Sequence, residues 1–181
     1  MNKKERIMRW IQTEGVQPCH DPEWTELLLK YLTPISIVFP DITQHVSAWY
    51  AYRMTEQAYT LEFEDTAGKD AIHWYMATKD ESEVIHAIGI SCEALLAGRK
   101  YSQMLILHEL AHMLTSEDHS IRFHETLSTL INDFNAATGS EITNDLYGIE
   151  TRYDSRPWTL PENIPVQQSQ QGTQFRTEAK R

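Results

Sequence analysis

The segment His108-Glu-Leu-Ala-His112 has the residue types and the spacing of a metal site. On a helix, positions i and i+4 differ by about 40° in angle and about 6 Å in height, so both imidazoles face one point. Two neutral imidazoles at that spacing can ligate a single Zn²⁺. Glu109 lies next to the first histidine, where it can reach a metal-bound water without ligating the metal, as a general base does. The segment therefore predicts zinc-dependent hydrolysis.

A catalytic zinc site needs a third protein ligand and an open fourth position. Three candidates follow the pair: His119, His124 and Glu125. His119 comes after a short polar turn over residues 115–118, long enough to reverse the chain and place an imidazole over the first two. His124 and Glu125 fall deeper in the next expected helix, on other faces than His119, so the three cannot ligate together. We favour His119 and keep His124 and Glu125 as alternatives.

The motif and its spacer resemble a known signature. His108-Glu-Leu-Ala-His112, a short spacer and His119-Ser-Ile-Arg-Phe123 look like the HExxH…HxxxF pattern of small zincin metallopeptidases of the SprT-like and WLM type. The resemblance covers roughly residues 84–135. It implies a zinc peptidase with His108, His112 and His119 as ligands and Glu109 as general base.

The resemblance also implies where a protein or peptide substrate binds. In zincins, the strand before the metal helix is a sheet edge whose free N–H and C=O groups pair with an extended substrate backbone. The expected strand from Val84 to Ile90 would take that place in this chain.

Two other functions fit the same residues. One is a binding or regulatory module that retains zinc as a structural element, although a purely structural site has no need of Glu109. The other is a regulatory protease of a phage or mobile element, similar to the ImmA type. The third ligand of that group differs from the spaced histidine found here, so it ranks lower.

The periodicity of the chain predicts the elements that would hold these residues. Asp21-Pro22-Glu23 is a strong helix start, and this helix is expected to end before Pro34. Strands are expected, from alternation or β-branched content, over residues 35–39, 46–53, 58–64, 71–77 and 84–90. The strands over residues 46–53, 58–64 and 71–77 would form an antiparallel meander, and the strand over 84–90 would follow it.

Beyond that point the apolar period becomes helical. Helices are predicted over residues 101–114 and from about 119 to 137, with Gly139 ending the second. The expected fold is α+β and zincin-like: N-terminal helices, a small antiparallel-rich sheet, and the HExxH helix followed by a second long helix. Residues 1–157 would form this one domain, and residues 158–181 a disordered tail.

Charge and composition limit the partners. The 181 residues carry 16 Lys and Arg against 26 Asp and Glu, a net charge of −10, so nucleic acid is not an expected partner. Cys19 and Cys92 are too few for a disulfide framework, and we expect small buried or half-buried side chains. No apolar stretch reaches the ~18 residues of a membrane span, and a cytoplasmic protein is expected.

Overall fold

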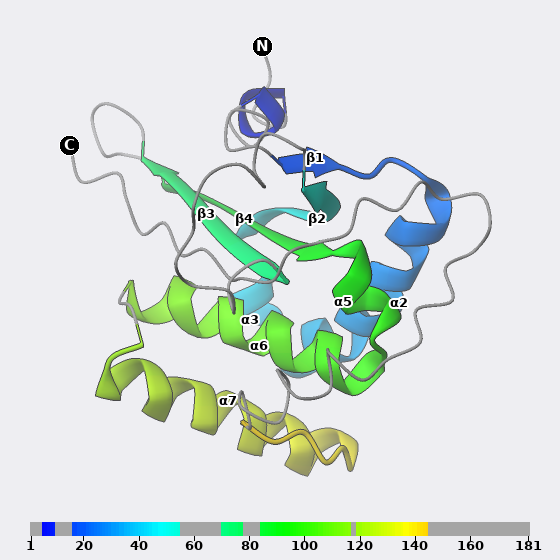
Figure 1. Cartoon of the computed structure of the whole chain (residues 1–181). Helices are drawn as coiled ribbons and strands as arrows, with labels where there is room; N and C mark the ends of the chain where they lie inside the picture. Colours follow the sequence, from blue (N-terminus) through cyan, green and yellow to red (C-terminus); the bar gives the residue numbers. More distant parts are fainter. Residues whose placement is uncertain (1–4, 10–15, 55–69, 78–83, 117–118, 145–181) are drawn as a thin grey trace.

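The computed structural model describes residues 5–9, 16–54, 70–77, 84–116 and 119–144. A short helix over residues 5–9 precedes the labelled elements of Figure 1. In chain order these are β1 (Val16–Pro18), α2 (Pro22–Val38), α3 (Pro40–Thr43), β2 (Val46–Met54), β3 (Ala71–Ala77), β4 (Val84–Ser91), α5 (Cys92–Leu96), α6 (Arg99–Thr115) and α7 (Ile121–Thr138). The predicted α+β class is confirmed, as are the two long helices that follow the sheet.

The sheet is mixed, with the strand order β1-β2-β4-β3. The β1–β2 and β3–β4 pairs are antiparallel, whereas β2 and β4 run parallel. The expected meander is wrong, because β4 lies between β2 and β3. The expectation that Val84 to Ile90 forms an edge is also wrong, because β4 pairs on both sides. Strand β4 is central because both of its faces are buried: Ile85 and Ile88 point to opposite faces, and both side chains are covered. Among the described strands, β3 is the edge on this side of the sheet.

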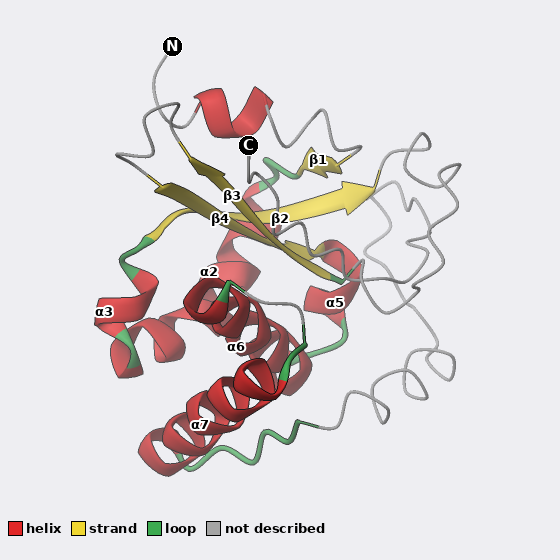
Figure 2. Ribbon diagram, turned by 90° about the vertical axis from the view of Figure 1, so that its left-hand side faces the viewer, coloured by secondary structure: helices red, strands yellow, loops and turns green. Residues whose placement is uncertain are grey.

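Helix α6 lies in the middle of the molecule. Figures 1 and 2 show it between the sheet and α7, and it contacts β3, β4, α2 and α7. Every residue from Ser102 to Met113 is buried, so this helix has no solvent-facing stripe. A helix that is covered on all sides holds its side chains in fixed positions, which suits a site that needs defined geometry.

The two faces of the sheet belong to separate apolar clusters. Ile88 and Ile90 join the main core with the helices, whereas Tyr52 and Trp74 pack on the opposite face with Ile7 of the short N-terminal helix. Gly89 lies under these two aromatic rings: a Cβ at Gly89 would meet Trp74 Cζ3 and Tyr52 Cδ1, both at 2.8 Å. The glycine is therefore required by close packing.

Helix α2 runs through Pro34 instead of ending before it, and the strand expected over residues 35–39 does not exist. Proline lacks the N–H that would bond to the carbonyl four residues back, which usually weakens a helix. Here Ile35 is fully buried in the main core, together with Leu28 and Leu32 on the same helix face. The burial of that face outweighs both the proline and the β-branched composition of the segment.

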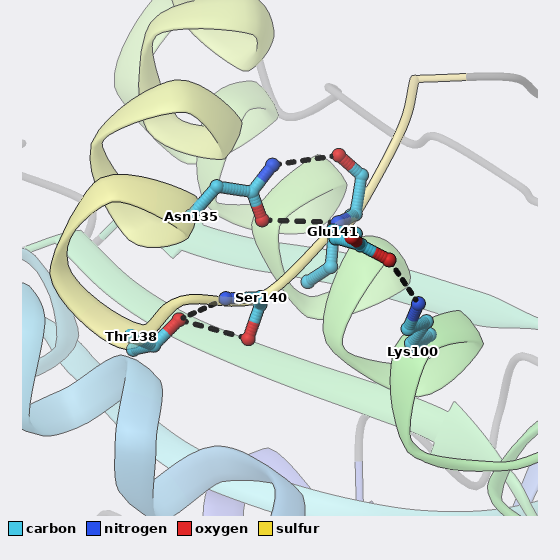
Figure 3. A network of polar contacts seen from close by, with 6 residues as sticks. Lys100, Asn135, Thr138, Ser140 and Glu141 are labelled. Atoms are coloured by element: carbon cyan, nitrogen blue, oxygen red, sulfur yellow. Dashed lines mark hydrogen bonds and ion pairs between the residues drawn. The ribbon is translucent and has the colours of Figure 1, made fainter.

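A polar network fixes the chain after α7 (Figure 3). Gly139 is in the left-handed region and ends the helix, as predicted. The Asn135 side chain donates from Nδ2 to the Ile142 carbonyl at 2.8 Å and accepts from the Ile142 N–H at 3.0 Å. The exposed pair Lys100–Glu141, at 3.4 Å, links the same segment to the start of α6. Ile142 is thereby held in the main core beside both long helices.

Strands 71–77 and 84–90 are confirmed to within one residue, and 46–53 likewise. The strand expected over residues 58–64 and the tail over residues 158–181 lie outside the described residues. Within the described part of the chain, no helix combines the length and the apolar character of a membrane span.

Candidate metal centre

The first two histidines of the motif lie on one face of α6, as their spacing predicts. Nε2 of His108 and Nε2 of His112 are 3.2 Å apart, and both residues are buried. The turn between them belongs to the continuous helix that spans Arg99–Thr115. The scaffold of the pair is therefore a rigid element, held from all sides.

The third histidine reaches the pair through a tight reversal after α6. Ser116 ends the helix in the left-handed conformation, and its N–H donates to the carbonyl of His112 at 2.8 Å. His119 has a φ of 24°, a value that non-glycine residues seldom adopt, and such strain is often found at functional sites. Ser120 then caps α7, since its Oγ accepts from the Phe123 N–H at 3.2 Å. The cap fixes the direction in which the chain leaves His119.

His119 completes a triad of imidazoles. Its Nε2 lies 3.3 Å from that of His108, and one ligand atom of each histidine lies within 4.8 Å of the other two. In a tetrahedral site with metal–nitrogen bonds of about 2.0–2.1 Å, ligand nitrogens are roughly 3.3 Å apart. The His108–His112 and His108–His119 separations match the edge of such a tetrahedron. The triad could hold a metal ion.

The alternative third ligands do not join this triad. His124 and Glu125 are exposed on α7, and the His124 ring stacks on His119 at a centroid distance of 6.2 Å. Among the described His, Cys, Asp and Glu residues, the three histidines are the group that could hold an ion. The structure thus brings together the residues that the sequence analysis favoured.

Phe123 supports the triad from α7. Its ring stacks on His112 at a centroid distance of 4.0 Å and meets His108 and His119 edge-on, both at 4.9 Å. Phe123 is itself fully buried, so it cannot move away from the imidazoles. From the sequence, this residue was expected as part of the HxxxF pattern and of the apolar stripe of the second long helix. The recurrence of Phe123 in that pattern beside His119 was the available signal that the two side chains are neighbours.

The pKa of His108 favours the form of its imidazole that binds a metal ion. Burial, and after it the neighbouring His119 and His124, lower the pKa of His108 to about 3. A neutral imidazole is the form that binds a metal ion, so no proton has to be removed from His108 at neutral pH. The donor set, three imidazole nitrogens, is one that Zn²⁺ prefers.

Glu109 is fully buried in α6, directly after the first histidine of the triad. Burial raises the pKa of its carboxyl well above the usual range, and the backbone of His73 opposes that shift. Neither carboxylate oxygen reaches hydrogen-bond geometry with another described group. A buried acceptor of this kind points to a water or an ion as its natural partner.

The position of His73 was not predicted. This residue lies in the edge strand β3, and its backbone lowers the pKa of the Glu109 carboxyl, against the effect of burial. Its side chain Nε2 is 2.9 Å from Nδ1 of His86 on β4, and the spacing of the two residues in the sequence does not predict this pair. Burial, and secondarily His86, lower the pKa of His73 to about 3, so the His73 imidazole is neutral at neutral pH. Strand β3 therefore adjoins the site through its backbone.

Comparisons of the chain with models of protein families, with curated proteins and with solved structures give no match.

Proposed function

We propose that the chain is a zinc-dependent peptidase that hydrolyses peptide bonds of a protein substrate. The observation that supports this best is the convergence of three imidazole nitrogens, at 3.2 and 3.3 Å, on the helix that also carries the buried Glu109. A structural zinc site usually has four protein ligands, whereas a hydrolytic one has three and leaves one position open. Three histidines and an adjacent carboxylate fit the second pattern.

Each residue of the site has a separate part in this proposal. His108, His112 and His119 would hold the ion, which in such sites acts as a Lewis acid and lowers the pKa of a bound water. Glu109 accepts the proton of the attacking water and returns it to the leaving amine. Phe123 holds the imidazoles by stacking on one and meeting two edge-on.

The substrate strand is proposed to be β3 rather than β4. Strand β3 is the described edge of the sheet on the side of β4, and it contacts α6. The backbone of its His73 lies near enough to Glu109 to affect the pKa of that carboxyl. An extended peptide that added to this edge would be held by main-chain hydrogen bonds and would need little sequence specificity.

The test compares Glu109→Gln with the wild type on an unfolded protein such as casein, with zinc content measured in parallel. Both proteins should hold about one zinc per chain, and Glu109→Gln should lose at least ~10²-fold in activity, the usual lower range for a general base. His119→Ala should lose zinc, whereas His124→Ala is the matched control that keeps it.

Two results would decide against the proposal. If zinc is bound equally well by His119→Ala, the triad is not the metal site. If zinc-loaded wild type and Glu109→Gln both fail to cleave a broad panel of proteins and peptides, the chain is the zinc-stabilised module instead.

A further inference from the structure

The chain has two cysteines, and the structure brings their sulfur atoms together. Cys19 follows the edge strand β1, and Cys92 is the first residue of α5, 73 positions later. The two Sγ atoms are 3.3 Å apart. At this distance the two thiols are hydrogen-bonded to each other. The sequence analysis expected two small buried or half-buried side chains and did not predict that they would meet.

The two thiols differ in accessibility and in acidity. Cys19 is half-buried, whereas Cys92 is buried in the main core. The hydrogen bond from the Cys92 thiol lowers the pKa of Cys19, with help from the Arg53 guanidinium, although burial and the carboxylates of Asp21 and Glu93 oppose it. The same hydrogen bond, and then burial, raises the pKa of Cys92. Cys19 is therefore the more accessible and more acidic thiol, suited to act as the nucleophile, and Cys92 is its buried partner.

A metal ion is not the explanation for this proximity. The described residues offer one group of three or more ligands that could hold an ion, and that group is the histidine triad. A pair of thiols without a third ligand is a poor zinc site, since zinc takes at least three protein ligands. The chemistry that two adjacent thiols support without other groups is oxidation to a disulfide.

We propose that Cys19 and Cys92 are a reversible redox pair that a peroxide converts to a disulfide. The Cys19 thiolate attacks one peroxide oxygen, the O–O bond breaks, and the leaving hydroxide takes a proton to become water. The resulting Cys19 sulfenic acid is attacked by the sulfur of Cys92, which forms the S–S bond and releases a second water. Two thiols and one hydrogen peroxide thus give one disulfide and two waters, and the two sulfurs supply both electrons.

The disulfide would tie the edge of the sheet to the region just before the metal helix. The N–H of Cys19 donates to the Ala51 carbonyl of β2 at 2.8 Å, so its backbone is anchored. Helix α5, which starts at Cys92, leads through Ala97 and Gly98 into α6. The new bond would close a loop that contains β2, β3 and β4, and large closed loops stabilise most. This inference is independent of the proposed peptidase activity.

The experiment treats the reduced full-length protein with hydrogen peroxide, then unfolds it, labels free thiols with a maleimide and measures the intact mass. Both thiols should become unreactive toward the maleimide together. The product should be a monomer about 2 Da lighter than the unlabelled reduced protein, and dithiothreitol should restore both thiols. The melting temperature of the oxidised protein should rise by up to roughly 10 °C.

Two variants test the assigned roles. In Cys92→Ala, Cys19 has no resolving partner and should accumulate as a sulfenic acid that reacts with dimedone. In Cys19→Ala, the buried Cys92 should stay reduced. Peroxide should not raise the melting temperature of either variant. If Cys92→Ala does not fold, Cys92→Ser replaces it, and the wild-type mass measurement needs neither. Unchanged thiols under excess peroxide, or a disulfide formed only between two chains, would overturn the proposal.

Discussion

The burial of Glu109 lowers the stability of the folded protein when no metal ion is bound. A carboxyl that is fully buried loses the hydration of its charged form, and burial accordingly raises its pKa. Nε2 of His108 lies 3.2 Å from that of His112 and 3.3 Å from that of His119, and Phe123 packs on the rings. A buried carboxyl beside such a triad is unfavourable without a cation and favourable with one, which is typical of sites formed for function rather than stability.

The cost predicts a pH dependence of stability. Above the unfolded pKa of about 4.3, the unfolded chain releases a proton that folded Glu109 retains, so the free energy of unfolding falls as pH rises. Gln does not titrate. In the presence of a chelator, Glu109→Gln should therefore gain roughly 1–3 kcal/mol relative to wild type between pH 5 and pH 7, as measured by urea unfolding. Parallel pH profiles of the two proteins would contradict the raised pKa.

The sequence predicted that the three histidines would lie together, because the first distance among them is set by one helix. A spacing of four residues fixes His108 and His112 without any knowledge of the fold. The position of His119 depended on a reversal whose length is visible in the sequence but whose left-handed geometry at Ser116 is not. The approach of His73 to Glu109 could not be predicted, because it depends on which strand becomes the edge of the sheet.

At the scale of elements, tertiary packing overrode local preference twice. Residues 35–39 have strand-like composition, yet they continue α2 because Ile35 is buried with the rest of that helix face. The strand before the metal helix was expected at an edge, yet β4 is central because both of its faces are apolar and covered. In both cases the deciding contacts come from residues far away in the sequence.

Gly89 gives a test of the packing between β4 and its neighbours. Gly89→Ala should destabilise the protein by about 1–3 kcal/mol in urea unfolding, since the new Cβ overlaps the Trp74 and Tyr52 rings. The cost should shrink in a Trp74→Phe background, where the contacting part of the indole is absent. Equal costs in both backgrounds would show that close approach to Trp74 is not what requires the glycine.

At the scale of the whole molecule, the triad spans two parts of the chain, helix α6 and the segment before α7. Two ligands lie on α6, and the third precedes α7 in the connection between the two helices. An ion bound there would link both long helices to one point, and binding to the folded state alone adds stability by mass action.

Metal removal should therefore lower thermal stability. A zinc-loaded protein with free zinc at about 100 times Kd gains about 2.7 kcal/mol, so a chelator should lower Tm by roughly 5–10 °C, and added zinc should restore it. His119→Ala is the control, and its Tm should respond little to either treatment. A chelator that leaves the wild-type Tm unchanged would argue against a bound ion that links α6 to the segment before α7.

The parallel pairing of β2 with β4 has a consequence for how the chain folds. Val46 pairs with His86, forty positions later, whereas Ala77 pairs with Val84 across a short connection. Closing the longer loop loses more chain entropy before any contact compensates for it, so β3–β4 and α6–α7 should form early and β2 should join late. The contacts of β2 would then form after the transition state for folding. Ala51→Gly in β2 should accordingly raise the unfolding rate and leave the folding rate nearly unchanged, whereas Ile88→Val in β4 should slow folding.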